Sequence, residues 1–206
     1  MVEDIKEFDK LIKEQKNFGT IGIRRQSTFS GKRRVGLDTN VFIKLYDQPM
    51  LFEYEESRIF RFGDLIFTNK ICVFELAKYI KKKRNIDMEE ARKETKEFIR
   101  KHNINVIYDF IPEDEVNKFE KESNEKLKQT GKTYLECHKP DSIILLSFKK
   151  RGINKVISTD EAFRVCATFL GIDGTSIPSL DAAISRELRK VFDYRKKKLG
   201  RGRRKR

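Results

Sequence analysis

Four acidic residues that lie far apart in the sequence, Asp38, Glu75, Asp141 and Asp160, could together bind a divalent cation. Each one stands close to a short apolar run that predicts a strand or a helix. Carboxylate oxygens are the ligands that Mg²⁺ and Mn²⁺ prefer, and a cation held by several acids can polarise a phosphodiester and activate water. This chemistry requires the four side chains to meet, so the elements that carry them must be placed first.

Asp38 follows residues 35–37, a short apolar run without helix signals that predicts a buried strand. Thr39 and Asn40, directly after it, bond readily to their own backbone and favour turns and helix starts. A helix is predicted from Val41. In an open α/β sheet this order places Asp38 at the carboxyl edge of a strand, where such folds bind ligands. The alternative is an acid that only caps the helix, and the stretch alone favours neither interpretation.

The other three acids are predicted at the same edge of the sheet. Residues 155–160 resemble the first stretch: a predicted strand is followed by hydroxyl residues and then by the carboxylate of Asp160. Glu75 lies about one turn into a predicted helix and Asp141 at the start of another, and crossover helices begin at the carboxyl edge. Asp141 and Asp160 could instead be ordinary acids at helix starts, whereas Glu75, between two apolar residues, needs a partner. All four on one edge favour a metal site, because carboxylates that repel one another are stabilised by a cation.

Strand candidates alternate with helix candidates along the chain. Strands are expected at 35–37, 65–68, 104–108 and 155–157, with a fifth toward Ile177, and helices at 72–80, 88–101, 113–128, 139–151 and 161–170. This alternation predicts an α/β fold with a parallel sheet of four or five strands and helices on both faces. The expected segments are an N-terminal amphipathic helix with a basic linker (1–33), one α/β domain (34–178), and a C-terminal helix with a basic tail (179–206).

The chain is strongly basic, with a formal net charge of +14. Much of the excess lies in residues 195–206, which contain nine cations and no acid: Arg195, Lys196, Lys197, Lys198, Arg201, Arg203, Arg204, Lys205 and Arg206. Tails of this kind bind nucleic acid or stay solvated, and we favour nucleic acid. Arg33 and Arg34, in the basic run before the first strand, are further candidates for this contact.

Cysteine usage and hydropathy exclude several classes of protein. The three cysteines are widely spaced and form no Cys-x-x-Cys pair, which argues against a disulfide framework and favours a reducing, cytoplasmic setting. No apolar run reaches the length of a membrane span, so no membrane partner is expected. The two histidines lack the spacing that is typical of a zinc site or a catalytic set.

Four short motifs occur in order between residues 34 and 178: Leu37-Asp38-Thr39-Asn40, Val73-Phe74-Glu75-Leu76, Pro140-Asp141-Ser142-Ile143-Ile144 and Ser158-Thr159-Asp160-Glu161-Ala162-Phe163. As a set they resemble the motifs of PIN-domain nucleases, and the small VapC-type toxin ribonucleases are the nearest likeness. The resemblance implies a three-layer α/β/α fold and a metal-dependent ribonuclease whose partner is RNA. It further implies that the four acids are catalytic residues that ligate Mg²⁺ or Mn²⁺, and that Thr39, Asn40 and Thr159 orient them.

The chain also departs from the minimal toxins, in its N-terminal extension, in its basic tail and in a long stretch between Glu75 and Asp141 that could hold a helical insertion. Without Cys-x-x-Cys pairs, the zinc-ribbon branch of the family that processes rRNA is not supported. Three interpretations stay open. We favour an endoribonuclease that hydrolyses single-stranded or structured RNA over an RNA-binding or scaffold protein of the same fold with weak or no cleavage. The third is a toxin of the same chemistry, and an antitoxin or a second copy of the chain stays open as a partner.

Overall fold

The computed structural model describes residues 33–48 and 63–177, and these residues build a central parallel sheet. Its five strands lie in the order β3-β2-β1-β4-β5, which confirms the predicted α/β class. They are β1 (Arg34–Leu37), β2 (Leu65–Asn69), β3 (Asn105–Ile107), β4 (Lys155–Ile157) and β5 (Asp173–Thr175). β1 occupies the centre and pairs in parallel with β2 on one side and β4 on the other.

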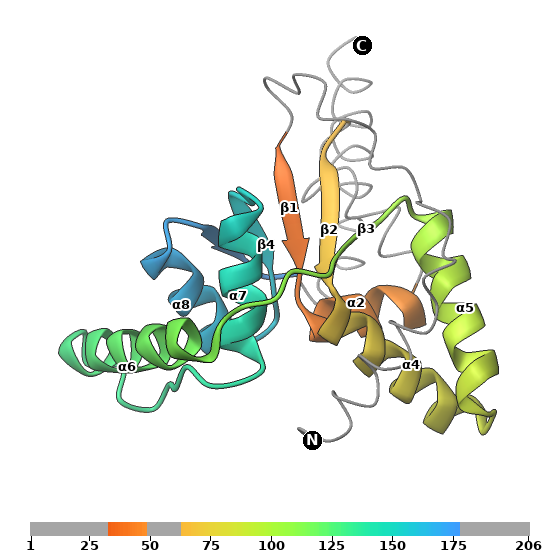
Figure 1. Cartoon of the computed structure of the whole chain (residues 1–206), viewed down its shortest axis with the longest axis horizontal. Helices are drawn as coiled ribbons and strands as arrows, with labels where there is room; N and C mark the ends of the chain where they lie inside the picture. The colour runs from red at the N-terminus through yellow and green to blue at the C-terminus, as the bar shows by residue number, and fades with distance from the viewer. Residues whose placement is uncertain (1–32, 49–62, 178–206) are drawn as a thin grey trace, which may run out of the picture. The chain divides into compact units, whose positions relative to one another are not determined.

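Helices cover both faces of this sheet. The described helices are α2 (Thr39–Asp47), α4 (Lys70–Arg84), α5 (Met88–Lys101), α6 (Glu113–Gln129), α7 (Asp141–Lys150) and α8 (Glu161–Phe169). Figure 1 shows α2, α4 and α5 together on one side and α6, α7 and α8 on the other. Right-handed crossovers between parallel strands produce this separation. The result is the three-layer α/β/α arrangement that the resemblance implied.

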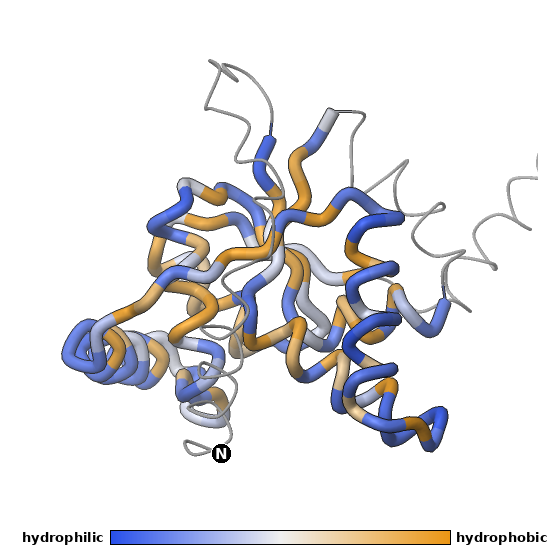
Figure 2. The backbone as a smooth tube through the Cα atoms, turned by 45° about the vertical axis from the view of Figure 1, so that its right-hand side comes forward, coloured by the Kyte–Doolittle hydropathy of each residue, from blue (hydrophilic) through white to orange (hydrophobic). Residues whose placement is uncertain are grey.

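The centre of the sheet is buried on both faces. Val35 and Leu37 in β1, and Val156 and Ile157 in β4, have no exposed surface, so these strands carry continuous apolar runs instead of alternating ones. Figure 2 shows hydrophobic segments in the middle of the fold and hydrophilic ones toward its periphery. At Gly36, β1 lies so close to α7 that a Cβ atom would stand 2.7 Å from Cε2 of Phe148.

Most predicted elements agree with the structure to within a few residues, and α4 extends beyond its predicted range at both ends, to Lys70 and to Arg84. This helix begins at Lys70 and not at residue 72, because the side-chain oxygen of Asn69 accepts a hydrogen bond from the Ile71 N–H group at 2.8 Å and caps the helix. The predicted N-terminal helix, C-terminal helix and basic tail fall outside the described residues. Within the described ranges, no helix is both long enough and apolar enough to cross a membrane.

Candidate active site

The parallel register brings three chain segments to one edge of the sheet. Leu37 of β1 pairs with Thr68 of β2 and with Ile157 of β4, so these three strands end within one residue of one another at the same edge. Asp38 is therefore next to the segment that leads to Asp160. This placement matches the edge expected from the sequence.

Asp38 is the N-cap of α2, as one of the two interpretations expected, and it is also a buried carboxylate. Its side chain is 3% exposed. Oδ1 accepts a hydrogen bond from the Thr39 N–H group at 2.6 Å, and Oδ2 accepts one from the Ser158 hydroxyl at 2.7 Å. Burial raises the pKa of Asp38 from 3.8 to about 6. The bonds from Ser158 and Thr39 oppose this rise in pKa, and the nearby charges of Asp160 and Glu75 add to it.

Asp141 is the first residue of α7 and a half-buried carboxylate in the same neighbourhood. Burial is the largest cause that raises its pKa, from 3.8 to about 7, and the charges of Asp38 and Asp160 raise it further. His138 lowers the pKa of Asp141, and the charge of Glu75 raises it. The charges of the other three acids thus all act on Asp141, and His138 lies close enough to oppose them.

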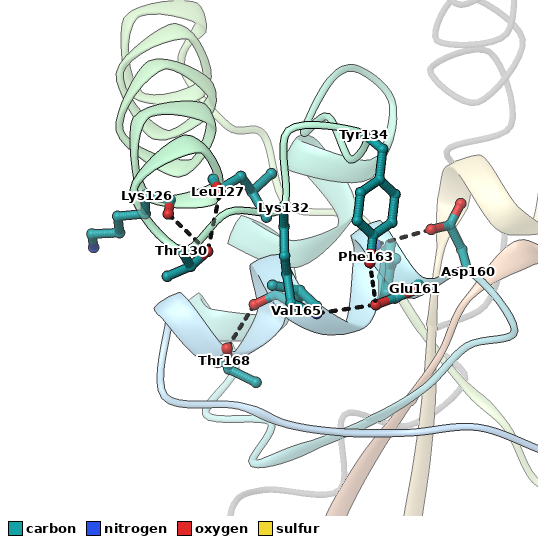
Figure 3. A network of polar contacts seen from close by, with 10 residues as sticks. All are labelled: Lys126, Leu127, Thr130, Lys132, Tyr134, Asp160, Glu161, Phe163, Val165 and Thr168. Atoms are coloured by element: carbon teal, nitrogen blue, oxygen red, sulfur yellow. Dashed lines mark hydrogen bonds and ion pairs between the residues drawn. The ribbon is translucent and has the colours of Figure 1, made fainter.

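Hydrogen bonds hold the two remaining acids at their helix starts. Glu75, in the second turn of α4, accepts a hydrogen bond from the hydroxyl of Thr39. Asp160 caps α8, and its Oδ1 accepts a hydrogen bond from the Phe163 N–H group at 3.1 Å (Figure 3). The N–H group of Asp160 donates to the Ser158 hydroxyl oxygen at 2.9 Å.

Ser158 joins two of the acids and was missed as a site residue by the sequence. Its buried hydroxyl donates to Asp38 and accepts from the backbone of Asp160. Thr39, by contrast, contacts both Asp38 and Glu75, through its N–H group and its hydroxyl. Asn40 and Thr159 are exposed, and their expected role in orienting the acids stays a prediction.

Arg33 and Arg34, at the start of β1, lie at the opposite edge of the sheet from the acids. Arg33 forms an ion pair with Asp64, with Nη2 and Oδ2 2.5 Å apart, and Arg34 donates to the backbone carbonyl of Arg151 at 2.6 Å. Neither side chain lies near the four carboxylates, and the contact of these two residues with RNA stays a prediction. The nine cations of the tail lie outside the described residues.

The four acids have the ligand atoms that a divalent cation prefers, although their side chains are not arranged around a common point. Among residues 33–48 and 63–177, no group of three or more His, Cys, Asp or Glu side chains is arranged to hold a metal ion. Carboxylate oxygens of Asp38, Glu75 and Asp160 are instead hydrogen-bonded to neighbouring N–H and hydroxyl groups. The donor set is nevertheless all oxygen, and a cation would offset both the burial and the repulsion that raise the pKa values of Asp38 and Asp141.

Comparison with known proteins identifies one family. The family model described as "PIN domain" matches residues 35–168. This range contains all four acids and the hydroxyl groups that bond them. No curated protein matches the chain.

Solved structures with a similar fold share little sequence with the chain. VapBC-1 from nontypeable Haemophilus influenzae is 16% identical, with 69% of this chain and 97% of that chain covered and a TM-score of 0.47. VapBC2 from Rickettsia felis, bound to a DNA fragment from its promoter, is 14% identical, with coverage of 69% and 98% and a TM-score of 0.49. A domain of a functionally unknown protein from Methanocaldococcus jannaschii is 16% identical, with coverage of 71% and 92% and a TM-score of 0.40. Similarity at this level carries no information about shared ligands or partners.

Proposed function

The chain belongs to the PIN domain family, and from this premise we propose that it is a metal-dependent endoribonuclease that hydrolyses phosphodiester bonds in RNA. The family is one of nucleases in general, and RNA as the substrate is the part of the proposal that the sequence resemblance suggests. The observation that carries the proposal is the burial of Asp38 and Asp141 beside two further acids, which raises the pKa values of both.

Such a cluster lowers the stability of the folded protein, and a purely structural role does not explain why the chain contains it. Carboxylates that are buried near like charges destabilise the protein unless a cation or a proton neutralises them. Perturbed pKa values of this kind are concentrated at functional sites. An RNA-binding or scaffold protein of the same fold has no need for all four acids, so we favour an enzyme.

The residues of the chain have distinct tasks in this mechanism. Asp38, Glu75, Asp141 and Asp160 would hold Mg²⁺ or Mn²⁺. When bound, the cation would polarise the scissile phosphodiester and activate a water molecule for attack. Ser158 and Thr39 fix the orientation of Asp38 and Glu75 through the hydrogen bonds described above, and such supporting bonds keep a ligand set in place. The strongly basic composition counters the repulsion between RNA phosphates and the acidic cluster.

A cleavage assay tests the proposal. Purified protein is incubated with end-labelled RNA in Mg²⁺ or Mn²⁺, and parallel samples contain a chelator or the Asp38→Asn variant purified in the same way. We expect the wild type to cleave the RNA when metal is present. In both parallel samples cleavage should be at least about a hundredfold slower, which is the effect of losing one interaction that stabilises the transition state. RNA that stays intact while it still binds to the wild type would make the RNA-binding protein the better interpretation. Equal cleavage by the variant would remove the acids from the mechanism.

A further inference from the structure

An exposed aromatic side chain lies beside the carboxylates. Tyr134 belongs to the segment between α6 and α7, and 70% of its surface is exposed. Its hydroxyl donates a hydrogen bond of 3.3 Å to Oε1 of Glu161, the first residue of α8 and the neighbour of Asp160 (Figure 3). The segment that carries Tyr134 then continues to Asp141. The hydroxyl end of the ring is thus anchored at the residue that follows Asp160, while most of the ring remains open to solvent.

Glu161 also anchors a cation at the same place. The ammonium group of Lys132 lies 3.0 Å from the Glu161 oxygen that Tyr134 contacts, and 36% of the Lys132 side chain is exposed. Tyr134 and Lys132 therefore share one oxygen atom of Glu161, which holds the two side chains next to each other. Arg164 adds a second positive charge near Glu161 and donates to the Ser158 carbonyl at 2.8 Å. Glu161 therefore positions other groups beside the acidic cluster.

An open aromatic ring with cations beside it is suited to a single nucleic-acid strand. Bases of a single strand stack on aromatic side chains whatever their sequence, and nearby cations contact the phosphates. In a duplex the base faces are already stacked on one another, so they are not available to a protein ring. We propose that Tyr134 stacks on an unpaired base of single-stranded RNA while Lys132 contacts a neighbouring phosphate. This rim of the site then selects single-stranded RNA over duplex RNA.

This inference rests on the proposed function for its choice of RNA, and its test does not depend on cleavage. The probe is a short fluorescein-labelled RNA without self-complementarity, either alone or annealed to its complement, and fluorescence anisotropy is measured in a chelator. Alanine replacement of a stacking aromatic residue weakens binding by about 5- to 150-fold per base. We expect Tyr134→Ala to weaken binding of the single strand by a factor in this range. The affinity of the variant for the duplex should differ from that of the wild type by less than about twofold, because the paired bases of a duplex cannot stack on the Tyr134 ring.

Two control variants separate stacking from other roles of Tyr134. Tyr134→Phe keeps the ring but loses the bond to Glu161, and it should retain most of the affinity for the single strand. Phe110→Ala removes another exposed aromatic side chain, which is 80% exposed. Its neighbour Asp109 forms an ion pair with Arg151 at the C-terminal end of α7, whereas Asp141 lies at the N-terminal end of this helix. This variant should bind the single strand like the wild type. Thermal unfolding of all three variants should match that of the wild type, because both rings are largely in solvent.

Three results would overturn the inference. They are wild-type affinity of Tyr134→Ala for the single strand, equal losses for the single strand and the duplex, or equal losses in the alanine and phenylalanine variants of Tyr134. The first result would be expected if a protein partner covers the ring in place of RNA. Failure of the proposed function gives a different pattern, since a protein without cleavage could still show the Tyr134-dependent preference for single strands.

Discussion

Replacing Asp38 by asparagine should stabilise the metal-free protein at neutral pH, because folding buries an ionised carboxylate there. The side chain is 3% exposed, and its pKa is about 6 in the folded protein against an ordinary value of 3.8. Each unit of difference in pKa between the folded and unfolded states corresponds to about 1.4 kcal/mol of stability. Ionised Asp38 therefore lowers the free energy of unfolding by about 3 kcal/mol at pH 7.

The sign and the pH range of this effect follow from the two pKa values. Well below 3.8, Asp38 is protonated in both states and its ionisation does not affect stability. As the pH rises from 3.8 to about 6, the unfolded chain releases its proton first, so the free energy of unfolding falls. Above this range the loss is constant. The asparagine variant lacks this titration, so its stability relative to the wild type should rise by about 3 kcal/mol across the range.

The assay is urea unfolding of wild type and variant in a chelator, followed by circular dichroism at several pH values. A constant offset between the two proteins reports altered hydrogen bonds to Ser158 and Thr39, whereas the change of the offset with pH reports the buried charge. Asp173→Asn is the matched control, because it makes the same chemical change at a carboxylate that is 68% exposed. An offset for Asp38→Asn that stays flat with pH would refute the reasoning that burial perturbs this carboxylate.

Three further outcomes are expected. Gly36→Ala should lower the free energy of unfolding in urea by about 1–3 kcal/mol, because its Cβ would overlap the buried ring of Phe148, and Phe148→Leu should restore part of the loss. Ser158→Ala should cost about 1–3 kcal/mol in the same assay, because it leaves an oxygen of Asp38 and the N–H group of Asp160 without their partner. It should also slow RNA cleavage, and wild-type values in both measurements would contradict its role. Deleting residues 201–206 removes five cations, so the slope of log affinity for single-stranded RNA against log salt should shrink by up to about 3.5; equal slopes would show that these residues do not contact RNA.

The edge that carries Asp38 and Asp160 could be predicted because it depends on local signals. A short apolar run with a carboxylate and a hydroxyl residue directly after it occurs at both places, and parallel strands bring their carboxyl ends together. The start of α4 was predicted less well. Asn69 is the last residue of β2 and also the N-cap of α4. Its Nδ2 donates a hydrogen bond to Ser147, which is 78 positions away, so no local sequence pattern indicates this contact.

The details of the candidate site depended on contacts that no local pattern contains. Ser158 and Thr159 are adjacent hydroxyl residues, and only the first is buried against Asp38. Because β4 is covered on both faces, alternation along the strand gave no signal to choose between them. The ion pair of Arg33 with Asp64, which is 31 positions away, likewise has no local signal, and the contact of Arg33 with RNA stays a prediction.

Calorimetric titration with Mn²⁺ tests most directly whether the four carboxylates act as one cation site. The wild type is compared with Asp38→Asn, Glu75→Gln, Asp141→Asn and Asp160→Asn, and Asp173→Asn is the surface control. We predict that the wild type and the control bind Mn²⁺ alike, and that each of the other four variants binds it about tenfold more weakly or worse. The same Mn²⁺ affinity in the wild type and all four variants, or no binding by the wild type, would contradict a shared metal site.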